Sequence, residues 1–329
     1  MSSNSKINIL SDIKENPWGG GNQFLKSLRQ ELVKKEWYDT SPESADIIIL
    51  DSYQKIIPAL NFKRYYPQKY LIHRLGPIFH LHRGPHWRFL DILVSSLANH
   101  VDWVVFQSEW SEKEFKKLGF KNKNFSVIKN ASDSQYFNTL LKKEPSQKIK
   151  LISYSWSSNP NKGFSTLKFL DENLDFSKYQ ITFIGNSPIK FKNIIQLDPL
   201  SNKDLATHLK KSDIFISASK DDACSNSIIE ALSCKIPVIA LNSGGNPELI
   251  NQGGELFNNQ SELINKINLV SNNLNKYRQD IKIDNIDTIT EKYLDSIDKA
   301  QTNKPRSISF LFFLKIKFFL FLFNIYKKI

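Results

Sequence analysis

Two carboxylates flank a predicted helix start in the second half of the chain. Asp222 lies in a polar loop, and Glu230 lies about one turn into the helix that follows. Between them, the backbone N–H groups of Ser225, Asn226 and Ser227 open that helix, and a helix N-terminus attracts phosphate. Carboxylates repel phosphate but accept hydrogen bonds from pairs of hydroxyl groups, such as those of a sugar or a ribose. The pattern suits a sugar nucleotide, and it also suits an ordinary capped helix with an incidental glutamate.

The elements around these residues predict a parallel α/β sheet. Ile214–Ile216 is a short apolar run of the buried-strand type, and Pro237–Leu241 is a second one, with a helical pattern between them. In parallel α/β sheets, ligands bind beyond the carboxyl ends of the strands. The polar residues that follow both runs are therefore expected at one edge of a sheet.

The order of these residues resembles the donor-site core of the retaining GT-B glycosyltransferases of family four, the glycosyl transferases group 1. That family carries a glutamate, seven residues and a second glutamate, and then A-x-x-x-x-x-P-V-I/V-A and G-G-x-x-E. This chain has Asp222, seven residues and Glu230, and then ALSCKIPVIA and GGNPEL. Two positions depart from the pattern, because Asp222 is one methylene shorter and Lys235 stands where glycine is usual. A left-handed conformation at Lys235 would cost about 1–2 kcal/mol.

The resemblance implies an α/β fold of the GT-B type, in which two Rossmann-like domains have parallel sheets facing a central cleft. It implies a retaining, hexosyltransferase-like enzyme that moves a sugar from a nucleotide-sugar donor to a saccharide or lipid-linked acceptor, as in polysaccharide biosynthesis. Catalysis would need no metal, and the nucleotide-sugar would be a co-substrate with no other cofactor. The alternative is a catalytically weak GT-B protein that binds or scaffolds.

The same resemblance assigns roles in the donor site. Glu230 would hold the nucleotide ribose, and Asp222 would hold the sugar hydroxyls. Lys162, in a Lys-Gly pair typical of the family, would contact the donor diphosphate together with the amides of Ser225–Ser227. The family's arginine just before that pair is missing, since Ser155–Ser157 stand there. An exposed loop lysine is the alternative for Lys162.

A glycine-rich loop precedes the first predicted helix. Gly19–Gly21 lie between a predicted strand, Lys6–Leu10, and a helix for which Asn22 is the expected N-cap. Glycine lets a ligand or backbone approach closely, and the resembled family's first loop faces the cleft, so Gly20 and Gly21 are assigned to donor binding. The spacing is not G-x-G-x-x-G, so it gives no dinucleotide fingerprint, and a flexible turn is the alternative.

A run rich in histidine and arginine follows the third predicted strand, Tyr70–Arg74. The run HRLGPIFHLHRGPHWRFLD is dense in titratable groups, which is typical of an acceptor face or part of a catalytic site. The candidates for catalysis are His73, Arg74, Arg83 and Asp91 in this part of the chain, together with Asp222 of the donor site. The alternative is a surface loop with incidental histidines.

Breaks in the pattern divide the chain into three parts. Residues 1–140 are expected to form an N-terminal, acceptor-side Rossmann-like domain, and the polar run 138–148 is expected to be the linker. Residues 150–300 are expected to form the nucleotide-sugar-binding Rossmann-like domain, which helices over about 261–277 and 284–300 would close. Residues 305–329 form an apolar and basic tail.

Composition narrows the class of partner and the compartment. The net charge is +12, which favours anionic partners or reflects a solvated lysine-rich surface. No nucleic-acid-binding motif accompanies the charge, so nucleic acid is not expected as a partner. Two cysteines, Cys224 and Cys234, argue against a disulfide framework and fit a reducing compartment, so that a cytoplasmic protein is expected. The basic surface and the apolar tail add the expectation of peripheral association at the inner face of the membrane. No Cys/His pair has metal-ligand spacing, and so no metal site is predicted.

The tail predicts contact with a membrane surface through residues 308–329. Seven of the 23 phenylalanines lie between Phe310 and Phe323. Lys315 and Lys317 interrupt this run, which disfavours a spanning helix and favours an interfacial anchor. Tyr326, Lys327 and Lys328 would then lie at the headgroups. A helix that docks on the body of the protein or on a partner is the alternative.

Overall fold

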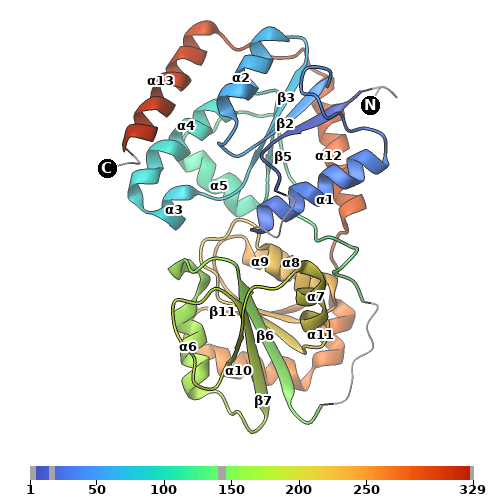
Figure 1. Ribbon diagram of the computed structural model, residues 1–329, viewed down its shortest axis with the longest axis vertical. Helices are drawn as coiled ribbons and strands as arrows, with labels where there is room; N and C mark the ends of the chain where they lie inside the picture. The colour runs from blue at the N-terminus through green and yellow to red at the C-terminus, as the bar shows by residue number, and fades with distance from the viewer. Residues whose placement is uncertain (1–4, 15–18, 140–145, 327–329) are drawn as a thin grey trace. The chain divides into compact units, whose positions relative to one another are not determined.

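The computed structural model describes residues 5–14, 19–139 and 146–326. Its contacts group the chain into two compact units, each built on one parallel sheet (Figure 1). Unit 1 comprises Met1–Ile13, Leu25–Lys129 and Asp287–Ile329, and unit 2 comprises Lys14–Phe24 and Asn130–Ile286. The predicted α/β architecture with two parallel-sheet domains is confirmed.

Unit 1 has a five-stranded sheet in the order β1-β2-β3-β4-β5, with every neighbouring pair parallel. Its elements, in chain order, are β1 (Ile7–Leu10), most of α1 (Gly20–Lys34), β2 (Ile47–Asp51), α2 (Ile56–Tyr65), β3 (Tyr70–Leu75), α3 (Phe79–Arg83), the 3₁₀ turn η1 (Pro85–Trp87), α4 (Arg88–Ala98), β4 (Trp103–Phe106), α5 (Glu109–Lys117), β5 (Phe125–Val127), α12 (Ile286–Gln301) and α13 (Phe310–Tyr326).

Unit 1 buries its sheet on both faces, as parallel sheets do. Alternate residues of β2 show this, because Ile48 and Leu50 join one core cluster with α2, α4, α5 and α13, whereas Ile47 and Ile49 are equally buried and point to the other face. The sequence of β2 is accordingly a continuous apolar run rather than an alternating one.

Helix α12 belongs to unit 1 from Asp287 onward, whereas the sequence analysis placed residues up to 300 in the second domain. Two contacts explain the difference. Lys35 of α1 forms ion pairs with Asp287 at 2.9 Å and Glu291 at 2.8 Å. The hydroxyl of Ser296 lies 2.9 Å from the hydroxyl of Ser126 in β5. No sequence pattern marks these partners, since they are far away along the chain.

Unit 2 has a six-stranded parallel sheet in the order β11-β10-β9-β6-β7-β8. Its elements are β6 (Ile149–Ser155), the 3₁₀ turn η2 (Pro160–Lys162), α6 (Phe164–Asn173), β7 (Tyr179–Gly185), β8 (Ile195–Leu197), α7 (Asn202–Lys210), β9 (Ile214–Ser217), α8 (Asn226–Ser233), β10 (Val238–Leu241), α9 (Asn246–Ile250), β11 (Gly254–Phe257), α10 (Gln260–Asn272) and α11 (Leu274–Asp280).

Two apolar layers cover the sheet of unit 2. Ile152, Phe215 and Val238 belong to the cluster formed with α7 and α8, whereas Leu151 and Ile214 belong to the cluster formed with α6 and α10. Neighbouring residues of each strand thus enter opposite layers. The order of the strands, numbered within this unit, is the doubly wound 3-2-1-4-5-6 arrangement of a Rossmann sheet.

Two helix boundaries differ from the sequence prediction. Helix α1 begins at Gly20, so that Asn22 lies in its first turn and is not the N-cap. The Asn22 side chain instead exchanges two hydrogen bonds with the backbone of Lys14, at 2.7 and 2.9 Å. The helix predicted over 261–277 is two helices, α10 and α11, because Asn273 (φ −130°, ψ 25°) interrupts it.

Lys235 ends helix α8 in the left-handed conformation that the sequence analysis considered. Its φ is +56°, and its N–H donates to the carbonyl of Leu232 at 2.9 Å. The N–H of Ile236 donates to the carbonyl of Ala231 at 3.0 Å. This pair of bonds is a Schellman motif, in which glycine is usual at the position of Lys235. The lysine ammonium group donates to the carbonyl of Ile281 at 2.6 Å, which offsets part of the strain.

The tail folds back as helix α13 onto unit 1, which confirms the docking alternative for one side of the helix. Phe313, Ile316 and Phe323 are buried in the same core cluster as α2 and α4. The ring of Phe323 lies edge-on to that of Trp87, with 5.2 Å between ring centroids. Among the described residues, no helix is both long and apolar enough to span a bilayer. Lys327, Lys328 and the side chain of Tyr326, predicted to lie at headgroups, fall outside the described residues, as do residues 140–145 of the predicted linker.

Candidate functional site

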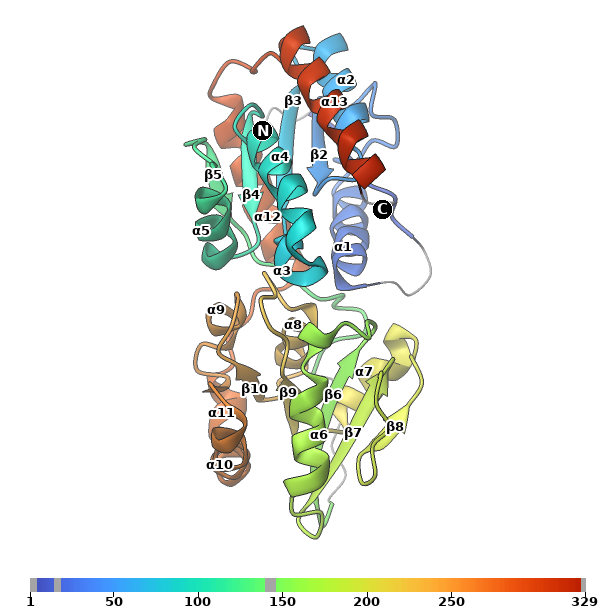
Figure 2. The ribbon, with the colours of Figure 1, turned by 90° about the vertical axis from the view of Figure 1, so that its left-hand side faces the viewer.

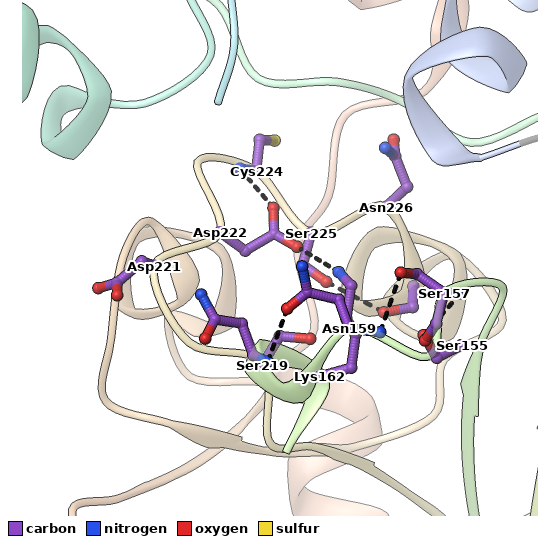
Figure 3. A network of polar contacts seen from close by, with 12 residues as sticks. Ser155, Ser157, Asn159, Lys162, Ser219, Asp221, Asp222, Cys224, Ser225 and Asn226 are labelled. Atoms are coloured by element: carbon purple, nitrogen blue, oxygen red, sulfur yellow. Dashed lines mark hydrogen bonds and ion pairs between the residues drawn. The ribbon is translucent and has the colours of Figure 1, made fainter. Parts of the chain in front are cut away.

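The strand order of unit 2 defines where its ligand site should lie. From β6 the chain runs outward through β7 to β8, and then returns to place β9 on the other side of β6. In open α/β sheets, the crevice beyond the carboxyl ends of the two strands at such a reversal is the usual binding site. The loops that follow β6 and β9 are therefore the predicted walls of a site, and they carry Lys162 and Asp222 (Figure 3).

Lys162 and Asp222 contact each other across these two loops. The ammonium nitrogen of Lys162 lies 3.1 Å from Oδ2 of Asp222, and both side chains keep part of their surface exposed, 31% and 21%. The other carboxylate oxygen of Asp222, Oδ1, accepts a hydrogen bond from the N–H of Cys224 at 3.3 Å. Figure 3 shows the two side chains pointing toward one another. The residue predicted to contact the donor diphosphate, Lys162, and the residue predicted to bind the sugar hydroxyls, Asp222, thus form an ion pair with each other.

Close backbone packing fixes this pair of loops. Gly163 has a φ of +78°, and a Cβ on it would lie 2.3 Å from the Cβ of Ala218. Gly244, in the loop after β10, has a φ of +61°, and its Cβ would lie 2.4 Å from the carbonyl oxygen of Asp222. That oxygen accepts a hydrogen bond from the N–H of Gly245 at 2.8 Å. Glycine is required at Gly163 and Gly244 by both backbone conformation and space.

The start of helix α8 leaves its first amides without a side-chain cap. Ser225 is buried at the N-cap position, but it makes no capping hydrogen bond. Its hydroxyl lies 3.0 Å from the hydroxyl of Ser227 instead. Asn226 and Ser227 remain partly exposed. An uncapped helix start has free N–H groups and positive partial charge, which suit a phosphate.

Glu230 lies one helical turn further on and contacts Tyr154 at the end of β6. The Tyr154 hydroxyl donates its one hydrogen to the Glu230 carboxylate, and the carbonyl oxygen of Ser227 also lies within hydrogen-bond distance of the hydroxyl, at 3.2 Å. Burial, and to a smaller extent the nearby carboxylate of Asp133, raise the pKa of Glu230 to about 7, against the hydrogen bond from Tyr154. Burial and the Glu230 charge also raise the pKa of Tyr154 well above its usual range. In its ionised form the Glu230 carboxylate can accept hydrogen bonds from the hydroxyl groups of a ligand, either together with the bond from Tyr154 or instead of it.

Tyr154 was not predicted as a site residue, and Asn246 was expected only as one of the polar residues after the second predicted strand. Asn246 is fully buried, and its amide nitrogen donates to the carbonyls of Ser219 at 3.0 Å and Leu241 at 3.1 Å. It therefore joins the loops that follow β9 and β10. Its side-chain oxygen is buried without a hydrogen-bond partner. A signal was present, because an Asn-Pro pair at a helix start is typical of a structured loop.

The four residues predicted for catalysis in unit 1 have separate surroundings. His73 is fully buried in β3, its Nε2 lies 2.7 Å from the carbonyl of Ser52, and burial lowers the pKa of His73 to about 4. Arg74 is 2% exposed and forms an ion pair with Asp51 at 2.5 Å. Both are core residues of unit 1. A catalytic role for them stays a prediction, and their burial disfavours it.

Arg83 and Asp91 also have structural partners. The Arg83 guanidinium stacks over the rings of Phe79 and Trp87, at 5.1 and 4.4 Å. Asp91 is fully buried, accepts the N–H groups of Phe79 and His80 at 2.9 Å each, and lies 2.7 Å from Nδ1 of His80. Burial raises the pKa of Asp91, against these hydrogen bonds. Asp91 thus holds the start of α3 and orients the imidazole of His80.

The other predicted residues are placed as follows. Gly20 and Gly21 form the first turn of α1, and their role in donor binding stays a prediction. Cys224 and Cys234 are both buried, and neither forms a disulfide. Within the described ranges, no group of three or more His, Cys, Asp or Glu side chains is arranged to hold a metal ion.

A family profile and one relative of known sequence each match part of this chain. The sequence profile of glycosyl transferases group 1 matches residues 171–273, which include Asp222, α8 and Glu230. An uncharacterized 41.2 kDa protein in the cps region of Klebsiella pneumoniae is 27% identical over 169 residues, which are 48% of this chain. The match spans about half of that relative, 47% of its length.

Comparison with solved structures shows the fold. HepE of Anabaena in complex with UDP-glucose aligns with a TM-score of 0.65 at 17% identity, over 91% of this chain and 98% of HepE. Sucrose-phosphate synthase of Thermosynechococcus elongatus aligns with a TM-score of 0.66 at 12% identity, over 91% of this chain and all of that chain, 100%. These proteins have the GT-B fold of glycosyltransferases, and this chain has the same fold.

Proposed function

We propose that this chain is a glycosyltransferase of group 1, which moves a sugar, with retention, from a nucleotide-sugar to a saccharide or lipid-linked acceptor. The observation that carries the proposal is the set of donor-site residues at the strand reversal of unit 2. Lys162, Asp222 and the uncapped start of α8 lie there together, with Glu230 one turn away. The profile match over 171–273 covers three of these four features and supports the same reading.

The ion pair between Lys162 and Asp222 suggests how a donor is received. A diphosphate at the start of α8 would compete for the Lys162 ammonium and release Asp222 to accept sugar hydroxyls. During transfer, the bond between the anomeric carbon and the diphosphate oxygen breaks, and negative charge develops on the leaving diphosphate. Lys162 and the α8 amides would stabilise that charge. The proposal therefore includes catalysis without a metal ion and without a cofactor beyond the donor.

A binding experiment tests the donor site. UDP and UDP-glucose are the first ligands to try, because HepE has been crystallised with both UDP and UDP-glucose. We expect a saturable rise in melting temperature with the right nucleotide-sugar, and at least a ten-fold weaker Kd for Lys162→Met, since a charge-assisted phosphate contact is worth about 1.5–3 kcal/mol. Lys168→Met is the matched control, because Lys168 is an exposed lysine, 64%, on α6 of the same unit. Equal Kd values for the two variants would contradict the site.

A transfer assay distinguishes an enzyme from its alternative, a GT-B protein that binds without catalysis. The alternative is favoured by Ser155–Ser157, which stand where the resembled family has an arginine. We expect release of nucleoside diphosphate, by hydrolysis or transfer, that persists in EDTA, and a product with the donor's anomeric configuration. Saturable donor binding with no release of diphosphate under any acceptor would support the alternative instead.

A further inference from the structure

One side of helix α13 is uncovered although the other side belongs to the core of unit 1. Phe313, Ile316 and Phe323 are at most 7% exposed. The uncovered side carries large apolar side chains that are 39–79% exposed: Phe310, Leu311, Leu314, Phe318, Phe321 and Leu322. A helix this apolar on its solvent side is unusual for a protein surface, since contiguous exposed apolar patches mark interaction sites.

The uncovered surface continues onto helix α4. Phe89 and Ile92 are 38% and 47% exposed, and the ring of Phe89 meets that of Phe319 on α13, with 5.5 Å between ring centroids. Figures 1 and 2 both show α13 alongside α2 and α4 on the outside of unit 1. We call this surface, formed by the outer sides of α2, α4 and α13, the α13 face.

Every exposed charge on the helices of the α13 face is positive. Lys315 and Lys317 are exposed on either side of the buried Ile316, so that they lie among the exposed phenylalanines. Arg64 and Arg88, at the end of α2 and the start of α4, are exposed as well. The one carboxylate of these three helices, Asp91, is 0% exposed. An apolar surface edged with cations and without exposed carboxylates is complementary to anionic headgroups over an acyl layer.

We infer that the α13 face docks on the surface of an anionic lipid bilayer. Helix α13 lies along the bilayer with its phenylalanines between the headgroups, while Lys315 and Lys317 extend to the lipid phosphates. The helix does not cross the bilayer, because its inner side is part of the core of unit 1. This inference does not depend on sugar transfer, since it concerns a surface of unit 1 and not the donor site.

Vesicle binding by the full chain tests the inference. Vesicles of phosphatidylcholine alone are compared with vesicles of equal parts phosphatidylcholine and phosphatidylglycerol, and bound protein is measured by sedimentation. We expect binding to the anionic vesicles that weakens with salt. The double change Phe318→Ser, Phe321→Ser should reduce the partition coefficient at least a hundred-fold, from the lost burial of two large side chains. The double change Lys315→Gln, Lys317→Gln should reduce it about five-fold for each lysine on anionic vesicles only.

Leu269→Ser is the matched control, because Leu269 is exposed to a similar extent, 43%, on α10 of unit 2. All variants should melt at the temperature of the wild type, since the changed side chains are exposed. The inference is overturned if the wild type stays in solution with anionic vesicles, or if the phenylalanine variant binds them as well as the wild type does. It is also overturned if the wild type does not bind vesicles and self-associates in sedimentation velocity, while the phenylalanine variant is monomeric. That result would make the α13 face a protein interface.

Discussion

Replacing Glu230 with glutamine should stabilise the protein above neutral pH, although Glu230 belongs to the proposed donor site. Burial beside Tyr154 raises the pKa of the Glu230 carboxyl from 4.5 to about 7. At pH 8 the folded protein therefore keeps a charge in poorly solvated surroundings, whereas the unfolded chain keeps it in water. A tenfold change in proton affinity is worth about 1.4 kcal/mol, so that this rise corresponds to about 3 kcal/mol as an upper bound.

The direction of the pH dependence follows from which state binds the proton more tightly. The pKa of Glu230 is higher in the folded protein than in the unfolded chain. Its contribution to the free energy of unfolding is therefore fully present below pH 4.5 and is lost as the pH rises through about 7. Glutamine resembles the protonated carboxyl in shape and stays neutral. The wild type and Glu230→Gln should thus have nearly equal stability at pH 5, and the variant should be more stable at pH 8.

Calorimetric melting at pH 5 and pH 8 measures the effect. For a unit of this size, about 3 kcal/mol corresponds to a rise in melting temperature of about 6–12 °C for Glu230→Gln at pH 8. Glu172→Gln, at an exposed carboxylate of α6 in the same unit, is the control and should follow the wild type at both pH values. A melting-temperature difference between wild type and Glu230→Gln that is the same at pH 5 and pH 8 would refute the reasoning. Donor affinity should fall in the same variant, because glutamine is a weaker acceptor for ribose hydroxyls.

Three further changes test the local geometry. Gly163→Ala should destabilise the protein by about 2–4 kcal/mol in urea unfolding, since it adds a clash with Ala218 to the strain of a positive φ. Gly119→Ala, at φ +94° with open space around it, should cost only about 1–2 kcal/mol, and an equal cost for both would count against the clash. Lys235→Gly should be more stable than Lys235→Ala by about 0.5–1 kcal/mol, because both lose the lysine's hydrogen bond but only glycine relieves the φ of +56°; equal melting temperatures would exclude strain there. Burial lowers the pKa of His73 to about 4, so the free energy of unfolding should fall by up to about 3 kcal/mol as the pH drops from about 6.5 to 4. In His73→Gln this decrease with falling pH should be smaller. A variant with the same pH dependence as the wild type would mean that other groups cause the decrease.

The donor side of the site could be predicted because most of its residues are local in the sequence. Asp222, the start of α8 and Glu230 lie within nine consecutive residues, where helical spacing alone sets their relative positions. Lys162 is different, because its ion pair with Asp222 depends on β6 and β9 being neighbours in the sheet. The resemblance to a family supplied Lys162, whereas the spacing of residues could not.

The predictions for unit 1 show what titratable residues alone cannot reveal. His73 and Arg74 lie on a central parallel strand, which is buried on both faces, so that polar groups there enter the core whichever way they point. Their partners, Asp51 and Ser52, lie at the end of β2 and just after it, some twenty residues earlier, and have no pattern that ties them to β3. A dense run of histidine and arginine therefore looks the same in a sequence whether its side chains contact a substrate or are buried against other residues of the protein.

The order of the units along the chain has a consequence for synthesis on the ribosome. Unit 2 is complete at Ile286, but unit 1 lacks α12 and α13 until the last segment, Asp287–Ile329, has emerged. Until then the apolar residues of α2 and α4 that Phe313 and Phe323 will cover remain open to solvent. Domains generally fold as units during synthesis, and exposed apolar surface on an incomplete one invites aggregation. Unit 2 can thus finish folding before unit 1 does. The core of unit 1 around α2 and α4 is closed only when α13 has been synthesised.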